Sequence, residues 1–259
     1  MKTPLLLSCA AAVLAGPPHA AAEPEPQYTL RIVAQESVPP KWLPREGSLP
    51  AGVCPDILAA IEKIQPRLRF SGMEEARSVP VIEQGLESGG VGAACALLDT
   101  PRRRQIASVA GKSLYTVRHR LAAAASDKVN IETLEELVRL RPLINTPRGA
   151  AYSDQLRILG LEVDDSTGDN LTNLRKIAAG HGRFIYMNEL TLAWLIREHN
   201  LQNKVRLLPN ILKEEPIYFW ISKKADPMAT RLADQALHRL HSSGELARIY
   251  QRWSSQRQP

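Results

Sequence analysis

The sequence predicts an α/β protein with a largely parallel sheet, and three observations carry this prediction. The apolar run at residues 91–98 has the length and composition of a strand that is buried on both faces. Ahead of it, residues 28–90 alternate between strand and helix patterns, the order that parallel strands with helical crossovers require. The composition, 44% hydrophobic and 23% charged over 259 residues, suits a globular protein of one large or two modest domains.

The first half of the chain supplies alternating elements. Pro55 and Asp56 suit the first turn of a helix, where a fixed φ and a negative charge are both favourable. A loop with four prolines precedes this helix at residues 37–50. A second helix follows, and we expect it to turn Val81 inward. The expected strands lie at residues 28–33, 68–70 and 91–98, and the expected helices begin at Pro55 and Pro80.

The second half continues the alternation. Asn130 and Asn170 stand before apolar stripes with helical spacing and are expected to cap those helices. Another helix begins at Asn188, and two C-terminal helices are expected to meet at Ser243. The expected strands of this half lie at residues 143–145, 184–187, 205–208 and 217–221.

The first 22 residues have the pattern of a signal peptide. Lys2 gives a positive start, residues 5–14 form an apolar segment too short to span a bilayer, and residues 20–22 are small alanines at the cleavage position. We therefore expect cleavage near Ala22 and export to the periplasm. Cys9 lies too early for a lipoprotein cleavage site, and no later apolar run is long enough for a membrane helix.

The net charge of +6 does not indicate a nucleic-acid partner. The basic residues are spread along the chain, and the single run, residues 102–104, has no aromatic residues among it. No His or Cys stands at metal-ligand spacing beside another, so we expect no metal and no cofactor.

The arginine run nevertheless follows a predicted buried strand directly. Ligands of open α/β sheets bind beyond the carboxyl ends of such strands, and the Thr100-Pro101 pair ends this one. An arginine at that place can hold a carboxylate through two parallel hydrogen bonds. Taken alone, the run is better explained as a solvated basic loop, and only its context favours a ligand site.

Three motifs make the chain resemble the bacterial extracellular solute-binding proteins of family 3. They are the strand followed by Thr-Pro-x-Arg, the helix opening at residues 52–58, and Ser-Gly-Glu-Leu-x-x-Ile-Tyr-x-x-Trp at residues 243–253. The resemblance implies a type 2 periplasmic binding protein fold, with two α/β lobes joined by two hinge crossovers and a ligand cleft between them. It places lobe 1 at residues 23–120 and 216–259, and lobe 2 at residues 121–215.

The resemblance also names candidate ligand-binding residues. Arg103 falls on the family's carboxylate-binding arginine, and Asn188 on an aspartate that holds the ligand ammonium in amino-acid receptors. Leu98 and Ala150 replace polar family positions, so the pocket is expected to be less polar than a standard amino-acid site. Gly149 lies in a loop whose free N–H groups would suit an anion, although it could merely make a turn. Trp42 resembles the aromatic of a cleft loop, but it could equally cover local core.

Removal of the signal peptide would leave two cysteines, Cys54 and Cys95. In an oxidising compartment such a pair commonly forms a disulfide, and the alternative is two separate buried thiols. The resemblance places them as neighbours at the cleft edge of lobe 1, which favours the bridge.

The function implied is a periplasmic receptor of an ABC importer, a monomer that delivers a small carboxylate-bearing solute, an amino acid or related organic acid, to a membrane permease. Two alternatives stay open. One is a cleft enzyme like the cyclohexadienyl dehydratases of the same fold, which would need a positioned proton donor. The other is a ligand sensor for a membrane receptor. No paired carboxylates and no nucleophile-base pair lie near Arg103 in the sequence, so we expect a binding protein and not an enzyme.

Overall fold

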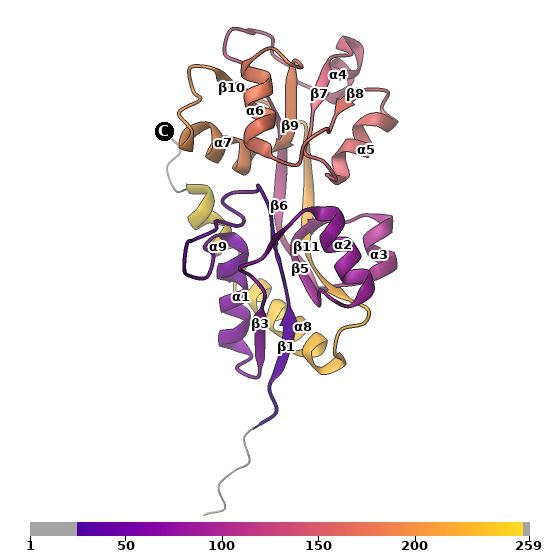
Figure 1. Cartoon of the computed structure of the whole chain (residues 1–259), viewed down its shortest axis with the longest axis vertical. Coiled ribbons are helices and arrows are strands. Elements are labelled where there is room, and N and C mark those ends of the chain that lie inside the picture. The colour runs from indigo at the N-terminus through magenta and orange to yellow at the C-terminus, as the bar shows by residue number, and fades with distance from the viewer. Residues whose placement is uncertain (1–24, 256–259) are drawn as a thin grey trace, which may run out of the picture.

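The computed structural model describes residues 25–255, and the predicted signal peptide at residues 1–22 lies outside this range. Figure 1 shows two lobes, one above the other, joined by two long strands. The lower body, called lobe 1 here, contains β1 (Tyr28–Arg31), α1 (Val53–Ile64), β3 (Leu68–Ser71), α2 (Val79–Ser88), β5 (Ala93–Leu98), α3 (Pro101–Ile106), α8 (Pro227–Ser242) and α9 (Glu245–Ser255). Two short strands, β2 (Ala34–Gln35) and β4 (Ala76–Arg77), also belong to it.

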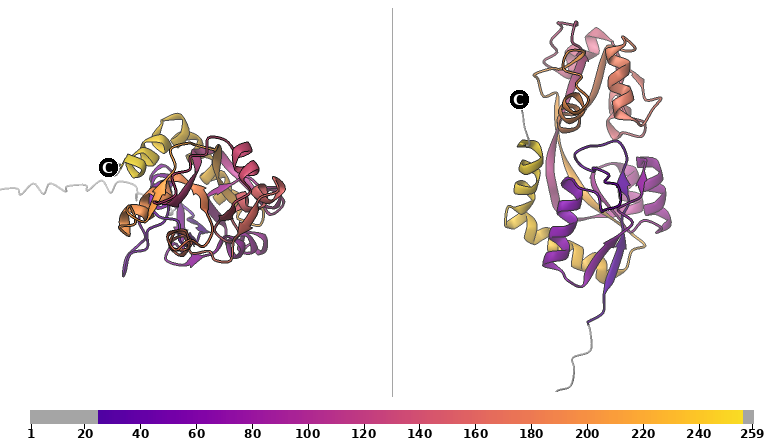
Figure 2. Two further views of the ribbon diagram at one scale, coloured as in Figure 1. Left: turned by 90° about the horizontal axis from the view of Figure 1, so that it is seen from above. Right: turned by 60° about the vertical axis from the view of Figure 1, so that its left-hand side comes forward.

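The upper body, lobe 2, is built from the middle of the chain. It contains α4 (Leu134–Leu140), β7 (Leu143–Asn145), α5 (Ala151–Ile158), β8 (Glu162–Asp164), α6 (Asn170–Ala178), β9 (Phe184–Asn188), α7 (Glu189–Glu198) and β10 (Val205–Leu207). The connecting strands are β6 (Ala107–Ala124) and β11 (Lys213–Ser222). Both are visible between the lobes from two directions (Figures 1 and 2). The two-lobed α/β fold expected from the sequence is confirmed.

The sheet is mixed, which corrects the expectation of a largely parallel one. The main sheet has seven strands: six run in the order β5-β11-β6-β9-β7-β8, and the seventh, β10, pairs with β6. The pairs β7–β8, β7–β9 and β1–β3 are parallel, whereas β6 and β11 pair antiparallel with each other and with their other neighbours. The physical reason is that the chain enters lobe 2 once and returns once, so its two crossing strands must run in opposite directions.

Several local predictions are corrected by side-chain contacts. Val81 is 45% exposed, because α2 turns Ile82 and Leu86 inward instead. Two helices are capped by residues other than the expected asparagines, with Thr133 in place of Asn130 and Asp169 in place of Asn170. Thr133 accepts a hydrogen bond from the Glu136 backbone N–H at the start of α4, and Asp169 caps α6.

The arginine run is helical and not a loop. Thr100 caps the six-residue helix α3 through a bond from the Arg103 backbone N–H. Pro101 at the first position suits this start, since it lacks a donor that would be unsatisfied there. The helix turns Arg103 into the protein, where it is 3% exposed, and leaves Arg102 and Arg104 on the surface.

The proline-rich loop is held against the start of α1. The N–H groups of Val53 and Cys54 donate to the carbonyls of Pro40 and Lys41 at 3.0 and 3.1 Å. Gly52 allows this approach, because its φ is +129° and a Cβ there would lie 2.4 Å from the Pro40 oxygen. The loop is therefore docked on lobe 1, with Lys41 presented toward β5.

Candidate functional site

A cavity of about 80 Å³ lies between the lobes. Lobe 1 contributes the proline-rich loop, the end of β5 and Arg103, and lobe 2 contributes the loop before α5 and the starts of α6 and α7. The lining residues are Gln35, Val38, Lys41, Val79, Ala96, Leu97, Leu98, Arg103, Val117, His119, Pro147, Arg148, Gly149, Ala150, Ala151, Tyr152, Asn170, Met187, Asn188 and Ile217.

Arg103 is the buried cation at the lobe 1 wall of this cavity. Its Nε donates to Glu83 Oε1 at 2.8 Å, and its Nη1 donates to the Leu98 carbonyl at 2.6 Å. These contacts hold the guanidinium plane from two sides. No other residue in the described part of the chain accepts from this guanidinium, so Nη2 remains for a ligand. Fixed in this way, the planar fork suits a carboxylate.

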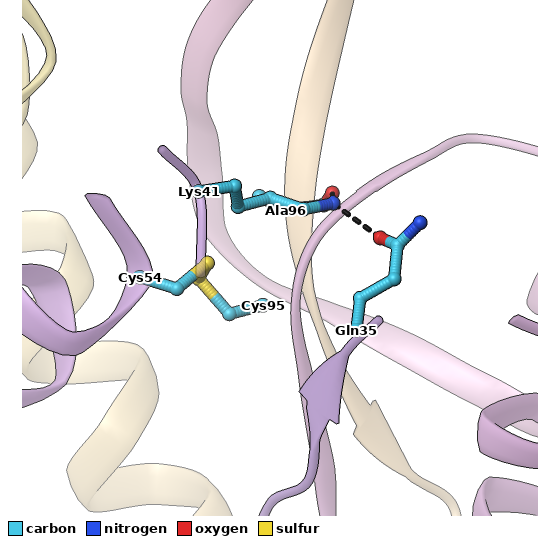
Figure 3. The surroundings of a disulfide bond; sticks show 5 residues. All are labelled: Gln35, Lys41, Cys54, Cys95 and Ala96. Atoms are coloured by element: carbon cyan, nitrogen blue, oxygen red, sulfur yellow. Dashed lines mark hydrogen bonds between the residues drawn. A yellow bond between two sulfur atoms is a disulfide. The ribbon is translucent and has the colours of Figure 1, made fainter. Parts of the chain in front are cut away.

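Lys41, a half-buried residue, brings a second cation to the cavity, and sequence reasoning missed it. Its ammonium donates to the Gln35 side-chain oxygen and, at 2.9 Å, to the Ala96 carbonyl. Figure 3 shows the Lys41 side chain extending past the disulfide toward Ala96 and Gln35. Burial, together with repulsion from Arg103, lowers the pKa of Lys41 to about 7.

The disulfide connects the start of α1, on which the loop of Lys41 is docked, to β5, whose Ala96 carbonyl accepts a bond from Lys41. Cys54 and Cys95 are bonded, with their Cα atoms 6.0 Å apart, which confirms the predicted bridge. Ala96, the residue after Cys95, has a φ of +60°, a left-handed conformation rare for a residue with a Cβ. This turn in β5 directs the Ala96 carbonyl to the Lys41 ammonium.

The lobe 2 wall offers backbone donors. Helix α5 starts after Ala150, whose side chain cannot cap it, and no residue in the described part of the chain accepts from the Ala151 and Tyr152 N–H groups. Free N–H groups at a helix start favour an anion. Gly149 also serves packing, since a Cβ there would lie 2.8 Å from Pro80 of lobe 1.

Asn188 lies at the end of β9 and caps α7. Its Oδ1 accepts from the Thr191 backbone N–H at 2.9 Å, which fixes the orientation of the amide. The amide oxygen is thus already engaged, and no residue in the described part of the chain accepts from the NH₂ group of this cavity-lining side chain. An amide held this way favours an acceptor on the ligand over an ammonium.

The lobes touch directly beside the cavity. Ser37 of lobe 1 donates through Oγ to Asp169 Oδ1 at 2.9 Å and accepts from the Asn170 backbone N–H at 2.8 Å. The Asn170 side chain also donates to the Ser37 carbonyl. The cleft in this structure is therefore closed at one side by contacts to the start of α6.

The sequence of residues 30–256 matches the model of the bacterial extracellular solute-binding proteins, family 3. The chain belongs to this family. No curated protein sequence matches this solute-binding protein.

Solved structures agree on the fold. A histidine kinase sensor domain with similarity to periplasmic binding proteins has a TM-score of 0.75 and 18% identity, covering 88% of this chain and 96% of that one. An ancestral arginine-binding protein has a TM-score of 0.69 and 18% identity, covering 88% and 98%. An ancestral amino acid-binding protein, a precursor of cyclohexadienyl dehydratase, has a TM-score of 0.69 and 16% identity, covering 87% and 95%. At these identities the likeness shows the fold alone.

Five of the six predicted ligand-binding residues of the solute-binding protein line the cavity, namely Leu98, Arg103, Gly149, Ala150 and Asn188. Trp42 does not. It is 3% exposed and packs in the hydrophobic core, and its neighbour Lys41 occupies the cavity wall. One signal could have pointed to Lys41: a lone lysine in a proline-rich loop directly before the first helix. Nothing in the sequence shows that its ammonium is buried.

A buried histidine forms part of the cavity floor. His119 of β6 is 1% exposed, and its ring centroid lies 5.0 Å from that of Tyr152 and 5.4 Å from that of Tyr186. Its Nδ1 lies 3.4 Å from Glu215 Oε2 of β11, without hydrogen-bond geometry. Burial outweighs the attraction of Glu215 and lowers the pKa of His119 to about 4.

The depressed pKa of His119 predicts a loss of stability in mild acid. The unfolded chain takes up a proton near pH 6.5 and the folded chain only near pH 4, so stability present above pH 6.5 is lost as the pH falls toward 4. We expect wild type to lose on the order of 1–2 kcal/mol more than His119→Gln between pH 7 and pH 5, measured by urea unfolding. His181→Gln, at an exposed position, should behave as wild type. Equal losses in all three proteins would contradict the assignment.

A larger cavity, of about 580 Å³, lies away from the cleft, between α7, β10 and α9. We place the functional site in the smaller cavity because it alone of the two brings together Arg103, Lys41 and the start of α5.

Within residues 25–255, no helix is long and apolar enough to cross a bilayer. The same residues contain no cluster of His, Cys, Asp and Glu side chains suited to a metal ion.

Proposed function

We propose that the protein is a periplasmic receptor that binds a small carboxylate-bearing solute between its lobes and delivers it to an ABC importer. The observation that supports this proposal is the pair of anion-binding groups on the two walls of the cavity. The Arg103 guanidinium, oriented by Glu83 and the Leu98 carbonyl, lies at the end of β5, opposite the start of α5, which has no side-chain cap. Both groups favour an anion, and they come from different lobes, so one ligand contacting both would stabilise the closed form. Family membership supports the importer as partner, and the substrate binding protein of an amino acid ABC transporter shares the fold at a TM-score of 0.68.

A binding role agrees better with the cavity than an enzymatic one. Acid-base catalysis needs a group whose pKa lies near the working pH and that reaches the reacting atom. The described residues that line the cavity include no Asp or Glu, and the buried His119 has a pKa of about 4. Lys41 does have a pKa of about 7, but its ammonium is held by Gln35 and the Ala96 carbonyl, and no described carboxylate of the lining pairs with it to relay a proton. Incubation with prephenate should therefore yield no product, and the appearance of phenylpyruvate would contradict the proposal.

The test of the receptor function is a direct search for the solute. Native mass spectrometry of protein purified from the periplasm should show a small co-purified mass, and a thermal-shift panel of carboxylates and amino acids should give at least one specific stabiliser. A ligand at one hundred times its Kd stabilises the native state by about 2.7 kcal/mol, which such a panel detects readily. No stabilisation by any carboxylate-bearing compound would contradict the proposal.

We propose the lobe boundaries near residues 120 and 215, inside β6 and β11, as the hinge. Closure of the lobes around ligand should reduce the radius of gyration measured by small-angle scattering. Ser37→Ala removes two contacts across the cleft and should give the ligand-free protein a larger radius than wild type. Ser242→Ala, which removes only contacts within α8, is the matched control. Identical profiles for all proteins, with and without ligand, would argue for a rigid scaffold.

A further inference from the structure

We propose that the solute carries two anionic groups and no ammonium group, and that it is a small dicarboxylate in chemical class. Arg103 binds one carboxylate and Lys41 binds the other. This inference rests on the proposed receptor function and names the class of solute for the same cleft.

The charges lining the cavity are all of one sign. Lys41, Arg103 and Arg148 line it, and the described lining residues include no Asp or Glu. A ligand ammonium would therefore enter beside cations with no carboxylate to pair with it. Burying an unpaired charge is costly, and like charges nearby add to that cost. A zwitterionic amino acid thus fits this lining poorly.

Lys41 has donor capacity that the protein does not use. Two of the three N–H groups of its ammonium are taken by Gln35 and the Ala96 carbonyl, both neutral acceptors. In the part of the chain that the structure describes, no carboxylate forms an ion pair with Lys41. A buried ammonium without a counter-ion is destabilised, in agreement with its lowered pKa. A ligand carboxylate would supply both the missing acceptor and the missing charge.

The placement of the two cations indicates two anionic groups. Lys41 is anchored on the Ala96 carbonyl and Arg103 on the Leu98 carbonyl, two residues apart on β5. The two cations are therefore held by different residues, and each keeps an N–H group that no described residue accepts. Two separately held cations suit two anionic groups better than one. Glu83 already balances part of the charge of Arg103, so Lys41 is the cation with the greater need of a partner.

The asparagines of lobe 2 agree with this assignment. Asn188 lines the cavity with its oxygen held by the Thr191 N–H, so its NH₂ group is the part of the amide with free capacity, and that group is a donor that suits an anion. Asn170 Oδ1 is buried without a hydrogen-bond partner. This oxygen is a neutral acceptor and would suit a hydroxyl on the solute, but it provides no charge for an ammonium.

The test is titration calorimetry on the ligand-free protein with a matched series of probes. Glutarate has two carboxylates, glutamate adds an ammonium to the same skeleton, and pentanoate has one carboxylate. Glutarate or its shorter homologue succinate should bind at least tenfold more tightly than glutamate and at least tenfold more tightly than pentanoate. Malate, which adds a hydroxyl to succinate, tests the Asn170 acceptor separately.

Lys41→Met keeps the length of the side chain and removes its charge. It should weaken dicarboxylate binding by thirtyfold or more and leave pentanoate binding within threefold of wild type. The matched control is Lys112→Met, at an exposed position outside the cavity lining, which should bind as wild type does. Circular dichroism checks the fold, and if Lys41→Met is unfolded the wild-type probe series decides alone.

Two results would overturn the inference. One is glutamate or another amino acid binding as tightly as any dicarboxylate, and the other is a folded Lys41→Met protein with unchanged dicarboxylate affinity. In both cases the receptor function would still stand, provided that binding depends on Arg103. Failure of every carboxylate-bearing probe and of the co-purification search would instead contradict the receptor function itself.

Discussion

Replacing Arg103 with alanine is expected to remove most of the affinity for a carboxylate-bearing solute. Truncating one partner of a desolvated charge pair costs about 2–5 kcal/mol, which corresponds to roughly thirtyfold to several thousandfold in Kd. The side chain is 3% exposed, and its guanidinium is already oriented by Glu83 and the Leu98 carbonyl. Removal of such a group leaves the ligand carboxylate without its bonds and Glu83 without its counter-ion. Titration calorimetry measures the first effect, and thermal unfolding measures the second.

The neighbouring arginines give matched controls. Arg102 pairs with Glu87 and Arg104 with Asp99, and their side chains are 49% and 72% exposed. Exposed pairs contribute little, so alanine at either position should change ligand affinity by less than about 1 kcal/mol. Arg103→Lys should rescue poorly, because an ammonium cannot reproduce the planar fork. Unchanged affinity in Arg103→Ala would remove the basis of the carboxylate proposal.

Loss of the Cys54–Cys95 disulfide is expected to have the largest effect on stability. The bonded cysteines are 41 residues apart in the sequence. Closing a loop of this size removes unfolded-state entropy worth about 4 kcal/mol at 25 °C in the chain-entropy model. The free energy of unfolding of the oxidised protein should exceed that of the reduced protein by about this amount, measured by urea titration with and without a reductant.

The same comparison tests the link between the bridge and the cleft. Because Cys54 follows the loop that carries Lys41 and Cys95 precedes Ala96, reduction should also weaken solute binding. Cys54→Ala/Cys95→Ala provides a reductant-free counterpart. Equal stability of the oxidised and reduced proteins, or two reactive thiols in unfolded but unreduced periplasmic protein, would be incompatible with a structural disulfide.

Local sequence patterns determined the fold class, most elements and much of the site. Strand β5 could be predicted from its apolar run, because a strand buried on both faces needs continuous apolar residues. Thr100 and Pro101 indicate the end of this strand, whether a loop or a helix follows them. The helix α9 motif and Arg103 were recognisable because these features depend on residues close together in the chain.

Tertiary contacts alone decided the chemistry of the cleft. Whether Trp42 or Lys41 enters the cavity depends on the docking of one loop on α1 and β5, set by Gly52 and the disulfide. Whether Asn188 offers an acceptor or a donor depends on the Thr191 N–H that occupies its oxygen. The pKa of Lys41 depends on the burial of its ammonium and on the nearby Arg103. Desolvation and charge act through space between segments far apart in sequence, so no local pattern records them.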